Sequence, residues 1–590
     1  MNDMKTPRIE ERYKNLEVLN KLKSLNYSDF KSNILSRRVS NVDDVEKISS
    51  PLLKYLSSPF LMEDMDKAVN RLISAIINNE VIGIETDHDC DGQTSHAIIY
   101  ESLVNIFGYS KDKIRSYIGH RMNEGYGLSD ALVDRIIHDD IRVDLLITAD
   151  NGSSDEPRIA RLKKIGISTI VTDHHEIPIE GIPESAYAVL NPTREDCNYP
   201  DKYIAGCMVA WLFMAATRNE ILKRKIEIKD KLPMSSLLDF VAVGTVADCV
   251  NMADSVNNRV VTIHGMKKIS NLDRYCWQVF KNKFKREISS EFIGFTIAPL
   301  LNSDGRLSDA LSSVNFLLSD SPVESQKWIN SLVQQNEKRK SIQKRITDVA
   351  LVEANKQVSA GKNSIVIYLE HGHAGVHGIS ASRIKDMYGR PTIIFSNKDE
   401  EVISGSARSI LDLNLKEILD SIHKTDGSIF IKYGGHSGAA GMTMHRNQFE
   451  QFSILFEKIL LEKISNEDNS FVIGPVIYTD GRISHSKINI HTLSCIKELE
   501  PYGRGFEAPI FQSNAILVSK RMVGQDQQHA QLKFNFSGNI IKGIWFNAKS
   551  HNHIYDLELN DEVLVIFKLG EEFFNGQHNL SLFVEYIQSF

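Results

Sequence analysis

Residues 81–92 read VIGIETDHDCDG, and this stretch decides the fold class of the chain. Its apolar, β-branched beginning is typical of a strand that is buried within a sheet. Asp87, Asp89 and Asp91 follow at alternate positions, and alternate side chains of an extended segment project to one side. Three carboxylates on one side repel one another unless cations neutralise them. Gly92 then permits a tight turn into a following helix.

A solvated acidic loop is the alternative interpretation of this segment. Similar apolar runs recur at 143–150 (VDLLITAD), 168–173 (STIVTD) and 186–192 (AYAVLNP), and helix-compatible stretches separate them. This alternation indicates βαβ units around a buried parallel sheet, which favours a loop at a sheet edge over a solvated one. The predicted fold class is therefore α/β.

Polar side chains follow three of these predicted strands. Asp150 ends the second run, and Asp173, His174 and His175 end the third. Because the carboxyl ends of parallel strands share one crevice in an open sheet, we expect these side chains beside the first acidic loop. Asp248, which ends the apolar stretch FVAVGTVAD, is a fourth contributor. The predicted catalytic cluster contains Asp87, Asp89, Asp91, Asp150, His174, His175 and Asp248.

Carboxylates combined with imidazoles suit a pair of divalent cations. Hard oxygen ligands favour Mg²⁺ or Mn²⁺, and imidazole nitrogen shifts the preference toward Mn²⁺. Two such ions about 4 Å apart lower the pKa of a water and stabilise charge on phosphorus oxygens, which is the usual chemistry of phosphoryl hydrolysis. We therefore predict a hydrolase that uses two divalent metal ions, with Mn²⁺ preferred or Mg²⁺.

The remaining sequence predicts further bodies. Residues 323–358 contain neither Pro nor Gly and are compatible with one long helix that joins two bodies. Strand-like runs at 364–370 and 391–396 predict a second α/β domain. After residue 470 the chain is rich in short β-type runs separated by turns, which indicates a small barrel.

Composition excludes several classes of protein. The 590 residues carry 69 Lys and Arg against 76 Asp and Glu, a net charge of −7, which argues against a uniformly basic coat but allows a local basic groove. No apolar run is long enough to span a membrane, and the charged first residues lack the apolar core of a secretory signal. None of the six cysteines forms a CxxC pair. We expect a reduced, cytoplasmic protein without a membrane partner.

The spacing of these motifs resembles that of the DHH phosphoesterases. The four segments that carry this resemblance are 87–92 (DHDCDG), 150–152 (DNG), 173–175 (DHH) and 244–248 (GTVAD). Other stretches resemble the associated DHHA1 domain, namely 375–391 (GVHGISASRIKDMYGRP), 404–410 (SGSARSI) and 433–444 (YGGHSGAAGMTM). Residues 499–511 (LEPYGRGFEAPIF) stand where the bacterial single-strand-specific exonucleases of this family begin an OB domain. The resemblance runs from about residue 60 to the end.

The resemblance implies a domain order. The expected segments are an N-terminal segment plus DHH catalytic domain at 1–322, a connecting helix at 323–360, a DHHA1-like domain at 361–468 and an OB-like nucleic-acid-binding domain at 469–590. The OB-like barrel would stack bases on aromatic side chains, although alternate strand residues point inward, so half or more of them should be core. The available aromatics are Phe534, Phe536, Trp545, Phe546, Phe573 and Phe574.

The resemblance also implies roles for the clustered residues. Asp87, Asp89, Asp91, Asp150, His174 and Asp248 correspond to metal ligands or their immediate support. Asp150 is the candidate for a ligand that bridges the two ions. Asp87 and His175 have an alternative role, which is to touch substrate or to orient ligands from outside the coordination sphere. Asp173 has the alternative of fixing the geometry of the strand end.

A second set of residues is implied for binding the end of a strand. A hydroxyl and a guanidinium at 406 and 408 suit a terminal phosphate, and the glycines at 434 and 435 let backbone N–H groups approach one. The candidates for substrate or phosphate binding are Arg121, Arg306, Ser406, Arg408, Gly434, Gly435 and His436. Structural alternatives are that Arg306 only pairs an acid and that the two glycines only form a turn.

The activity implied by the resemblance is exonucleolytic hydrolysis of single-stranded DNA from 5′ to 3′, in DNA recombination and repair. A groove too narrow for a duplex would select single strands, a single-stranded-DNA-binding protein is the expected partner, and the chain is expected to be a monomer. One rival is a DHH phosphodiesterase that acts on short oligonucleotides or cyclic dinucleotides. The other rival is a catalytically inactive scaffold that binds single strands.

Overall fold

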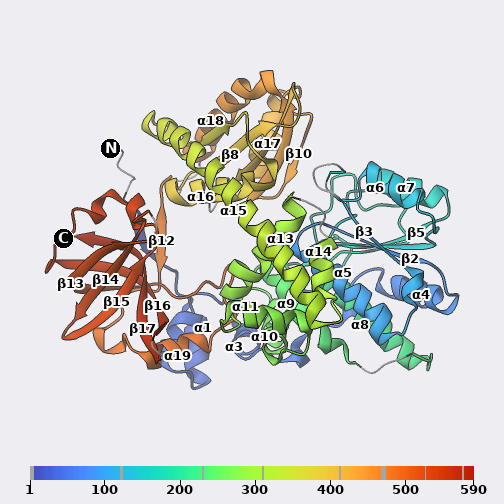
Figure 1. Cartoon of the computed structure of the whole chain (residues 1–590), viewed down its shortest axis with the longest axis horizontal. Coiled ribbons are helices and arrows are strands. Elements are labelled where there is room, and N and C mark those ends of the chain that lie inside the picture. Colours follow the sequence, from blue (N-terminus) through green and yellow to red (C-terminus); the bar gives the residue numbers. More distant parts are fainter. Residues whose placement is uncertain are drawn as a thin grey trace. The chain divides into compact units, whose positions relative to one another are not determined.

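The computed structural model of the chain falls into two compact units, each with its own core (Figure 1). Unit 1 comprises Met1–Tyr13, Lys338–Ile496 and Pro509–Phe590, and unit 2 comprises Lys14–Glu337 and Lys497–Ala508. The residues that the structure describes are 6–119, 124–125, 127–228, 232–307, 311–410, 413–466, 473–524, 526–574 and 577–589.

A five-stranded parallel sheet forms the centre of unit 2. Its strands, in the spatial order β3-β2-β4-β5-β6, are β3 Ile114–Ile118, β2 Ile82–Thr86, β4 Leu145–Ala149, β5 Ser168–Thr172 and β6 Ala188–Leu190. Every residue of β2, β4 and β6 is buried, as expected for strands that are covered on both faces. The predicted parallel sheet is confirmed, and β3 is an additional edge strand that the sequence analysis did not find.

Helices cover both faces of this sheet. In Figure 1, α6 and α7 lie on one side, where they share a core with Leu146 and Val171, and α4, α5 and α8 lie on the other. Helices α8 and α9 are apolar nearly all round, which is typical of helices in the interior. The helices of unit 2 are α1 Leu16–Ser24, α2 Asp29–Leu35, α3 Val45–Ser49, α4 Met65–Ile77, α5 Cys90–Glu101, α6 Asp130–Ile137, α7 Glu156–Lys164, α8 Gly206–Lys223, α9 Leu238–Ala247, α10 Val256–Asn271, α11 Tyr275–Phe284, α12 Ser290–Phe292, α13 Ala298–Leu307 and α14 Leu311–Leu317, with π-helical turns at Ser102–Ile106 and Ile293–Ile297.

The predicted long helix is a single element, α15 Pro322–Ser359. Its first part belongs to unit 2 and its second part to unit 1. The α/β domain that follows has a sheet in the order β10-β11-β9-β8-β7, in which β7 and β8 are parallel and the other pairs are antiparallel. Its elements are β7 Ile365–Tyr368, α16 Ala374–Tyr388, β8 Thr392–Asn397, β9 Val402–Arg408, α17 Leu415–Thr425, β10 Lys432–Gly435, β11 Ala439–His445 and α18 Phe449–Asn466.

The C-terminal segment forms the predicted barrel. It is closed in the order β13-β14-β15-β17-β16 and contains β13 Phe511–Val523, β14 His529–Phe536, β15 Asn539–Trp545, β16 Glu562–Phe574 and β17 Gln577–Ser589. Elsewhere in unit 1, β1 Arg8–Glu11 pairs with β12 Val476–Thr479, and α19 spans Ile490–Lys497.

Most of the described barrel aromatics are core residues, as expected. The side chains of Phe534, Phe536 and Trp545 are buried, whereas Phe546 is 55% exposed and its ring stacks on that of Phe583. The side chains of Phe573 and Phe574 lie outside the described part of the structure.

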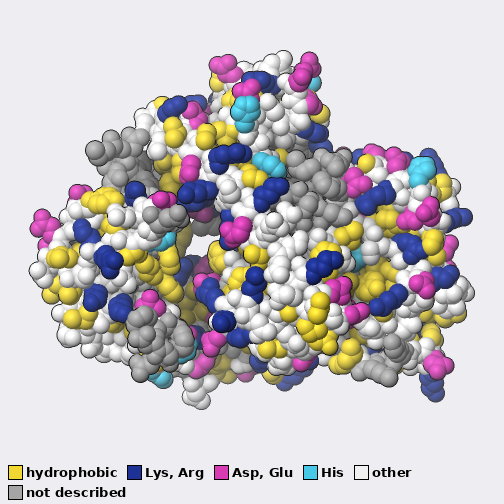
Figure 2. Space-filling view, in the orientation of Figure 1, with side chains coloured by type: hydrophobic (Ala, Val, Ile, Leu, Met, Phe, Trp, Pro, Cys, Tyr) yellow, Lys and Arg dark blue, Asp and Glu magenta, His cyan; other side chains and the backbone are white. Residues whose placement is uncertain are grey.

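The surface carries charges of both signs. In Figure 2, Lys and Arg side chains are interspersed with Asp and Glu side chains over the visible face. None of the helices that the structure describes is long and apolar enough to cross a membrane.

One segment packs differently from its predicted assignment. Residues 497–508, which the sequence places with the barrel, belong to unit 2. The reason is Arg259 of α10, which is fully buried and donates to the carbonyl oxygens of Ile48 (2.9 Å), Pro501 (2.9 Å) and Leu499 (3.1 Å). The four-segment division of the chain otherwise stays a prediction.

Replacing Arg259 with Lys should destabilise unit 2, because an ammonium cannot reach three diverging carbonyl groups with the fork of a guanidinium. We expect a loss of about 2–4 kcal/mol in the free energy of unfolding, since buried acceptors are left without donors. Urea unfolding would measure it, with Arg224→Lys, at the exposed C-cap position that follows α8, as the matched control. A loss no larger than that of the control would contradict the role given to Arg259.

Candidate metal centre

The first acidic segment is the junction between β2 and α5. Strand β2 ends at Thr86, and Asp89 is the N-cap of α5, whose side chain accepts hydrogen bonds from Asp91 N (2.9 Å) and Gly92 N (3.1 Å). Asp91 therefore lies in the first turn of the helix. The prediction that the three aspartates meet by alternating along an extended strand is wrong for Asp91, which joins the others because the helix begins between them.

Gly92 has a different task from the predicted turn. A Cβ atom at this position would lie 2.2 Å from the carbonyl oxygen of Asp87, so only glycine lets the helix start this close to the strand end. The amide of Asn302, in α13, accepts a hydrogen bond from Cys90 N (2.7 Å) and holds the same junction from the other side. The sequence analysis did not assign this supporting role to Asn302.

The start of α8 fixes the carboxylate of Asp91. Gly206 N donates to Asp91 Oδ2 (2.7 Å) and Cys207 N donates to Asp91 Oδ1 (3.0 Å). Backbone amides at a helix N-terminus stabilise an anion through hydrogen bonds and through the partial positive charge of the helix. Each carboxylate oxygen keeps a second lone pair, so Asp91 remains able to bind a cation.

Asp150 and His174 face each other at the ends of β4 and β5. Asp150 adopts a left-handed backbone conformation (φ 63°), and its N–H donates to Thr172 O (2.9 Å). Asp150 Oδ1 and His174 Nε2 lie 3.1 Å apart, and neither of these buried atoms makes a hydrogen bond with a described residue. Buried polar atoms need a partner, and a shared cation is the partner that suits a carboxylate and an imidazole at this separation.

Asp248 reaches the same place from the end of a helix. It is the C-cap residue of α9, and its Oδ2 lies 3.7 Å from His174 Nε2. Asp91 Oδ2 lies 3.9 Å from the same nitrogen. His174 is therefore surrounded by three carboxylates that come from a strand end and from two helix ends.

The acids and imidazoles form three overlapping sets, and within each set the potential ligand atoms lie within 4.8 Å of one another. Asp150 occurs in two sets and His174 in two, so the cluster has the connectivity of two neighbouring cation sites. The sets are Asp150, His174 and His175; Asp91, His174 and Asp248; and Asp87, Asp89 and Asp150. All seven side chains of the predicted cluster thus meet, and the individual ligand roles stay predictions.

Burial and mutual repulsion both oppose ionisation of the acids in the cluster. Burial, reinforced by neighbouring carboxylates, raises the pKa of Asp150 and of Asp248 well above the usual value of an aspartate, and it raises the pKa of Asp89 as well. Burial would also raise the pKa of Asp87, but His88, whose Nδ1 lies 2.8 Å from Asp87 Oδ1, holds it below its usual value. Bound divalent cations would relieve the repulsion among the other acids. The donor set therefore fits hard divalent ions.

Asp173 fixes the end of β5, as the structural alternative predicted. Its Oδ1 accepts hydrogen bonds from His174 N (2.7 Å) and His175 N (3.1 Å), and its Oδ2 accepts one from Ser153 N (3.0 Å). His175 Nδ1 also lies 2.7 Å from Asp173 Oδ1. Burial would lower the pKa of His175, but this carboxylate raises it to about 10. His175 is therefore a cation at neutral pH.

Of the residues predicted to bind a strand end, Ser406, Arg408 and Gly434 lie on one sheet face of unit 1, and Gly435 and His436 follow Gly434. Ser406 in β9 pairs with Gly441 in β11, which pairs with Gly434 in β10. Arg408, two residues further along β9, pairs with Ala439. This face is partly exposed, whereas the alternate residues of β9 are buried.

The two glycines differ in their surroundings. No atom lies within 4 Å of the place where a Cβ of Gly434 would stand. At Gly435 (φ 140°) a Cβ would lie 2.4 Å from Ala439 O, so this position is closely packed. His436 N donates to Ala439 O (2.8 Å), which brings the histidine to the level of Arg408. Five of the seven predicted binding residues thus come together. Arg121 and the side chain of Arg306 lie outside the described residues.

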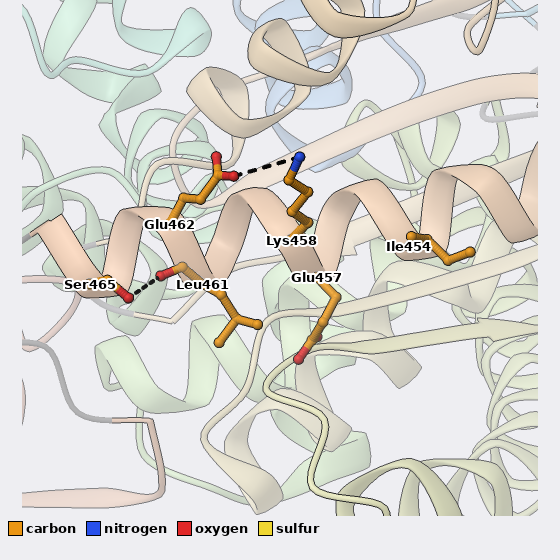
Figure 3. A pocket seen from close by; sticks show the side chains of 6 residues that line it. All are labelled: Ile454, Glu457, Lys458, Leu461, Glu462 and Ser465. Carbon is orange, nitrogen blue, oxygen red and sulfur yellow. Dashed lines mark hydrogen bonds and ion pairs between the residues drawn. The ribbon is translucent and has the colours of Figure 1, made fainter.

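A separate hollow on unit 1 is not part of either site. It has a volume of about 500 Å³ and lies along α18, where Lys458 and Glu462 form an ion pair (Figure 3). Its lining residues are Ile454, Glu457, Lys458, Leu461, Glu462 and Ser465, and none of them belongs to the predicted sites.

Three known protein domains match the chain in sequence. The "DHH family, N-terminal domain" matches residues 81–245, the "DHHA1 domain" residues 361–462 and the "RecJ OB domain" residues 479–586. The chain is 32% identical over 565 residues to the single-stranded-DNA-specific exonuclease RecJ of Haemophilus influenzae. The aligned region covers 94% of this chain and 95% of the relative. The chain is 30% identical to the RecJ of Escherichia coli, with 94% of each covered.

Solved structures share the fold. RecJ from Thermus thermophilus in complex with Mn²⁺ matches 99% of this chain and 80% of its own, with a TM-score of 0.78 and 22% identity. A structure described as exonuclease RecJ bound to manganese matches 69% of this chain and 96% of its own, with a TM-score of 0.56 and 26% identity.

The Asp173–His175 pair should make stability depend on pH. Asp173 has a pKa below its usual value, so its contribution to the free energy of unfolding is present above about pH 4 and is lost below that. His175 has a pKa raised from 6.5 to about 10, so its contribution is complete below pH 6.5 and disappears as the pH rises toward 10. In metal-free protein, His175→Gln should therefore reduce the urea midpoint most near pH 6 and least near pH 10. A difference from wild type that is equal at both pH values would contradict this coupling.

Proposed function

The chain belongs to the RecJ family of single-stranded-DNA-specific exonucleases, and from this membership we propose that it hydrolyses single-stranded DNA from the 5′ end. The observation that carries the proposal is the cluster in unit 2, where Asp150 and His174 each belong to two potential cation sites. Water attack on a phosphodiester held across two cations is the reaction that such a cluster supports.

We propose that Asp87, Asp89, Asp91, Asp150, His174 and Asp248 hold two divalent metal ions, Mn²⁺ in preference or Mg²⁺. When bound, the ions supply a water of lowered pKa and neutralise charge on the phosphorus oxygens. Asp150, which groups with Asp87 and Asp89 and whose Oδ1 also lies 3.1 Å from His174 Nε2, would be the ligand shared by the two ions. The amides at the start of α8 keep Asp91 in place through both of its oxygens.

His175 has a role of its own in this proposal. Asp173 orients the imidazole ring of His175 and keeps it protonated. The side chain of His175 is 45% exposed. A cationic imidazole on the open side of the cluster donates a hydrogen bond to a phosphate oxygen of the substrate. It acts on the substrate from beside the metal ligands.

We propose that Ser406, Arg408, Gly434, Gly435 and His436 bind the phosphate at the 5′ end. The guanidinium of Arg408 supplies a fork of donors, and the open space at Gly434 lets an oxyanion approach the backbone there. Arg121 and Arg306 are proposed for the same task.

The remaining proposals concern partners and context. The barrel matches the RecJ OB domain, and single-stranded DNA is its proposed ligand. We propose that the chain is monomeric, that it works with a single-stranded-DNA-binding protein and that it acts in DNA recombination and repair. The match to all three domains speaks against a phosphodiesterase of short oligonucleotides, for which a barrel would be unnecessary.

Asp150→Ala should abolish cleavage, because it removes the shared ligand and leaves His174 without its nearest carboxylate. We expect the cleavage rate with Mn²⁺ to fall at least about 100-fold. Mutation of residues that merely orient metal ligands already lowers metal affinity or activity by about 10–100-fold. Digestion of single strands carrying a label at either end measures both rate and polarity. Asp140→Ala, at an exposed position of unit 2, is the control. A fully active variant, or products released from the 3′ side, would contradict the assignment.

Arg408→Ala should weaken recognition of a phosphorylated end more than it slows cleavage at saturating substrate. We expect KM for a 5′-phosphorylated strand to rise about tenfold or more, because a charge-assisted hydrogen bond is lost. KM for the strand without the phosphate should change little. Arg446→Ala, near the other end of the same sheet, should leave the preference intact. Equal losses on both strands would remove Arg408 from the phosphate site.

A further inference from the structure

A tight turn at residues 502–506 lies beside the metal centre in unit 2. Gly503 N donates to Phe506 O (3.1 Å) and Phe506 N donates to Gly503 O (3.0 Å), which closes a two-residue turn. Gly505 takes the left-handed conformation (φ 77°) that such a turn requires. Arg504 therefore stands at the tip of the turn.

Several contacts fix the position of this turn. Met252 N donates to Arg504 O (2.8 Å), four residues after Asp248. Tyr502 N donates to Ser290 Oγ (2.9 Å). The buried ring of Phe506 lies under the guanidinium of Arg259, 3.9 Å from the ring centroid, so the base of the turn is anchored in the core.

The side chain of Arg504 is exposed, and its turn packs on the segment that follows Asp248. Besides the hydrogen bond from Met252 N to Arg504 O, a Cβ atom on Gly505 would lie 3.0 Å from Asn251 Oδ1, three residues after Asp248. The guanidinium makes no hydrogen bond or ion pair with the residues that the structure describes. A guanidinium that an anchored turn carries to the surface with its donors unused is suited to a phosphate oxygen.

An exposed aromatic side chain lies five residues after Ser290, the residue whose hydroxyl accepts the hydrogen bond from Tyr502 N. Phe295 is 81% exposed, although its neighbours Ile293 and Ile297 in the same π-helical turn are buried. The turn packs on α9, because a Cβ on Gly294 would lie 3.5 Å from Val246, two residues before Asp248. π-Helical turns occur frequently at functional sites, and an exposed ring offers a surface on which a nucleobase can stack.

We propose that Arg504 and Phe295 form a strand-binding rim beside the metal centre of unit 2, where Arg504 binds a backbone phosphate of the single strand and Phe295 stacks on one of its bases. This inference rests on the proposed function and adds to it a binding site on the same unit as the metal cluster. It places strand contacts in unit 2 that are independent of the barrel.

The phosphate contact is tested by the salt dependence of binding. In an Asp150→Ala background, which prevents cleavage, fluorescence anisotropy gives the Kd for a labelled oligo-dT at several salt concentrations. Arg504→Gln should weaken binding about tenfold at low salt and reduce the slope of log K against log salt by about 0.7, the value for one phosphate contact to a single strand. Arg504→Lys, which keeps the charge, should retain the slope. Arg224→Gln, at the exposed C-cap position that follows α8, should change neither quantity.

The stacking contact is tested with an abasic strand. Phe295→Ala should weaken binding of oligo-dT by about 5- to 150-fold, the range expected for loss of one stacked base, whereas Phe295→Trp should bind as the wild type does. On a strand of the same length without bases, Phe295→Ala and the wild-type side chain should bind equally. Tyr203→Ala removes another exposed aromatic residue of unit 2 and should have no effect.

Two outcomes would overturn the rim. One is an unchanged affinity and salt slope for Arg504→Gln, and the other is wild-type binding of oligo-dT by Phe295→Ala. Thermal unfolding of each variant separates a lost contact from a lost fold. If the wild-type chain fails to cleave single strands with Mn²⁺, the proposed function itself fails. If the wild-type chain cleaves and the variants bind as it does, only the rim is wrong.

Discussion

Repulsion among buried carboxylates is the constraint on which the organisation of unit 2 depends. Asp89, Asp150 and Asp248 all have pKa values raised by burial and by their acidic neighbours. Such a cluster persists only where other parts of the fold hold each acid in place. The start of α8 does this for Asp91 through two backbone amides, and the capping hydrogen bonds of α5 do it for Asp89. The hydrogen bonds from the surrounding helices therefore offset part of the cost of placing these acids together.

Strand ends alone do not build this centre. A parallel sheet delivers Asp87, Asp150 and His174 to one edge, which is the usual place for a ligand in an α/β fold. The other acids come from helix ends, because Asp91 lies in the first turn of α5 and Asp248 caps the end of α9. Helices that pack on one face of the sheet thus complete a site that begins at its edge, and the positions of their ends determine the ligand geometry.

The sequence predicts the parts of the fold that depend on short-range patterns. Uninterrupted Val, Ile and Leu runs identify β2, β4 and β5, and a stretch without Pro or Gly identifies α15. Strand β3 was not predicted because the polar residues Arg115 and Ser116 interrupt its short apolar sequence, IRSYI. The sequence did not predict that the amide of Asn302 accepts a hydrogen bond from Cys90 N, or that residues 497–508 pack in unit 2. Both features depend on contacts between residues that are far apart in the sequence. The spacing of the motifs correctly identified the aspartates of the cluster. It did not predict that Asp91 reaches the others because α5 begins between them.

Net charge does not describe what a polyanionic strand meets at this centre. The chain carries −7 overall, but charges farther away than about 8 Å are screened at physiological salt. Near the cluster, His175 is held as a cation by Asp173, and the exposed Arg504 lies on a turn that contacts the segment after Asp248. Together with bound divalent ions, these two cations would offset the negative charge of the acids that a phosphate meets there. In the proposed function, strand binding by this acidic chain would therefore depend on occupancy of its metal centre.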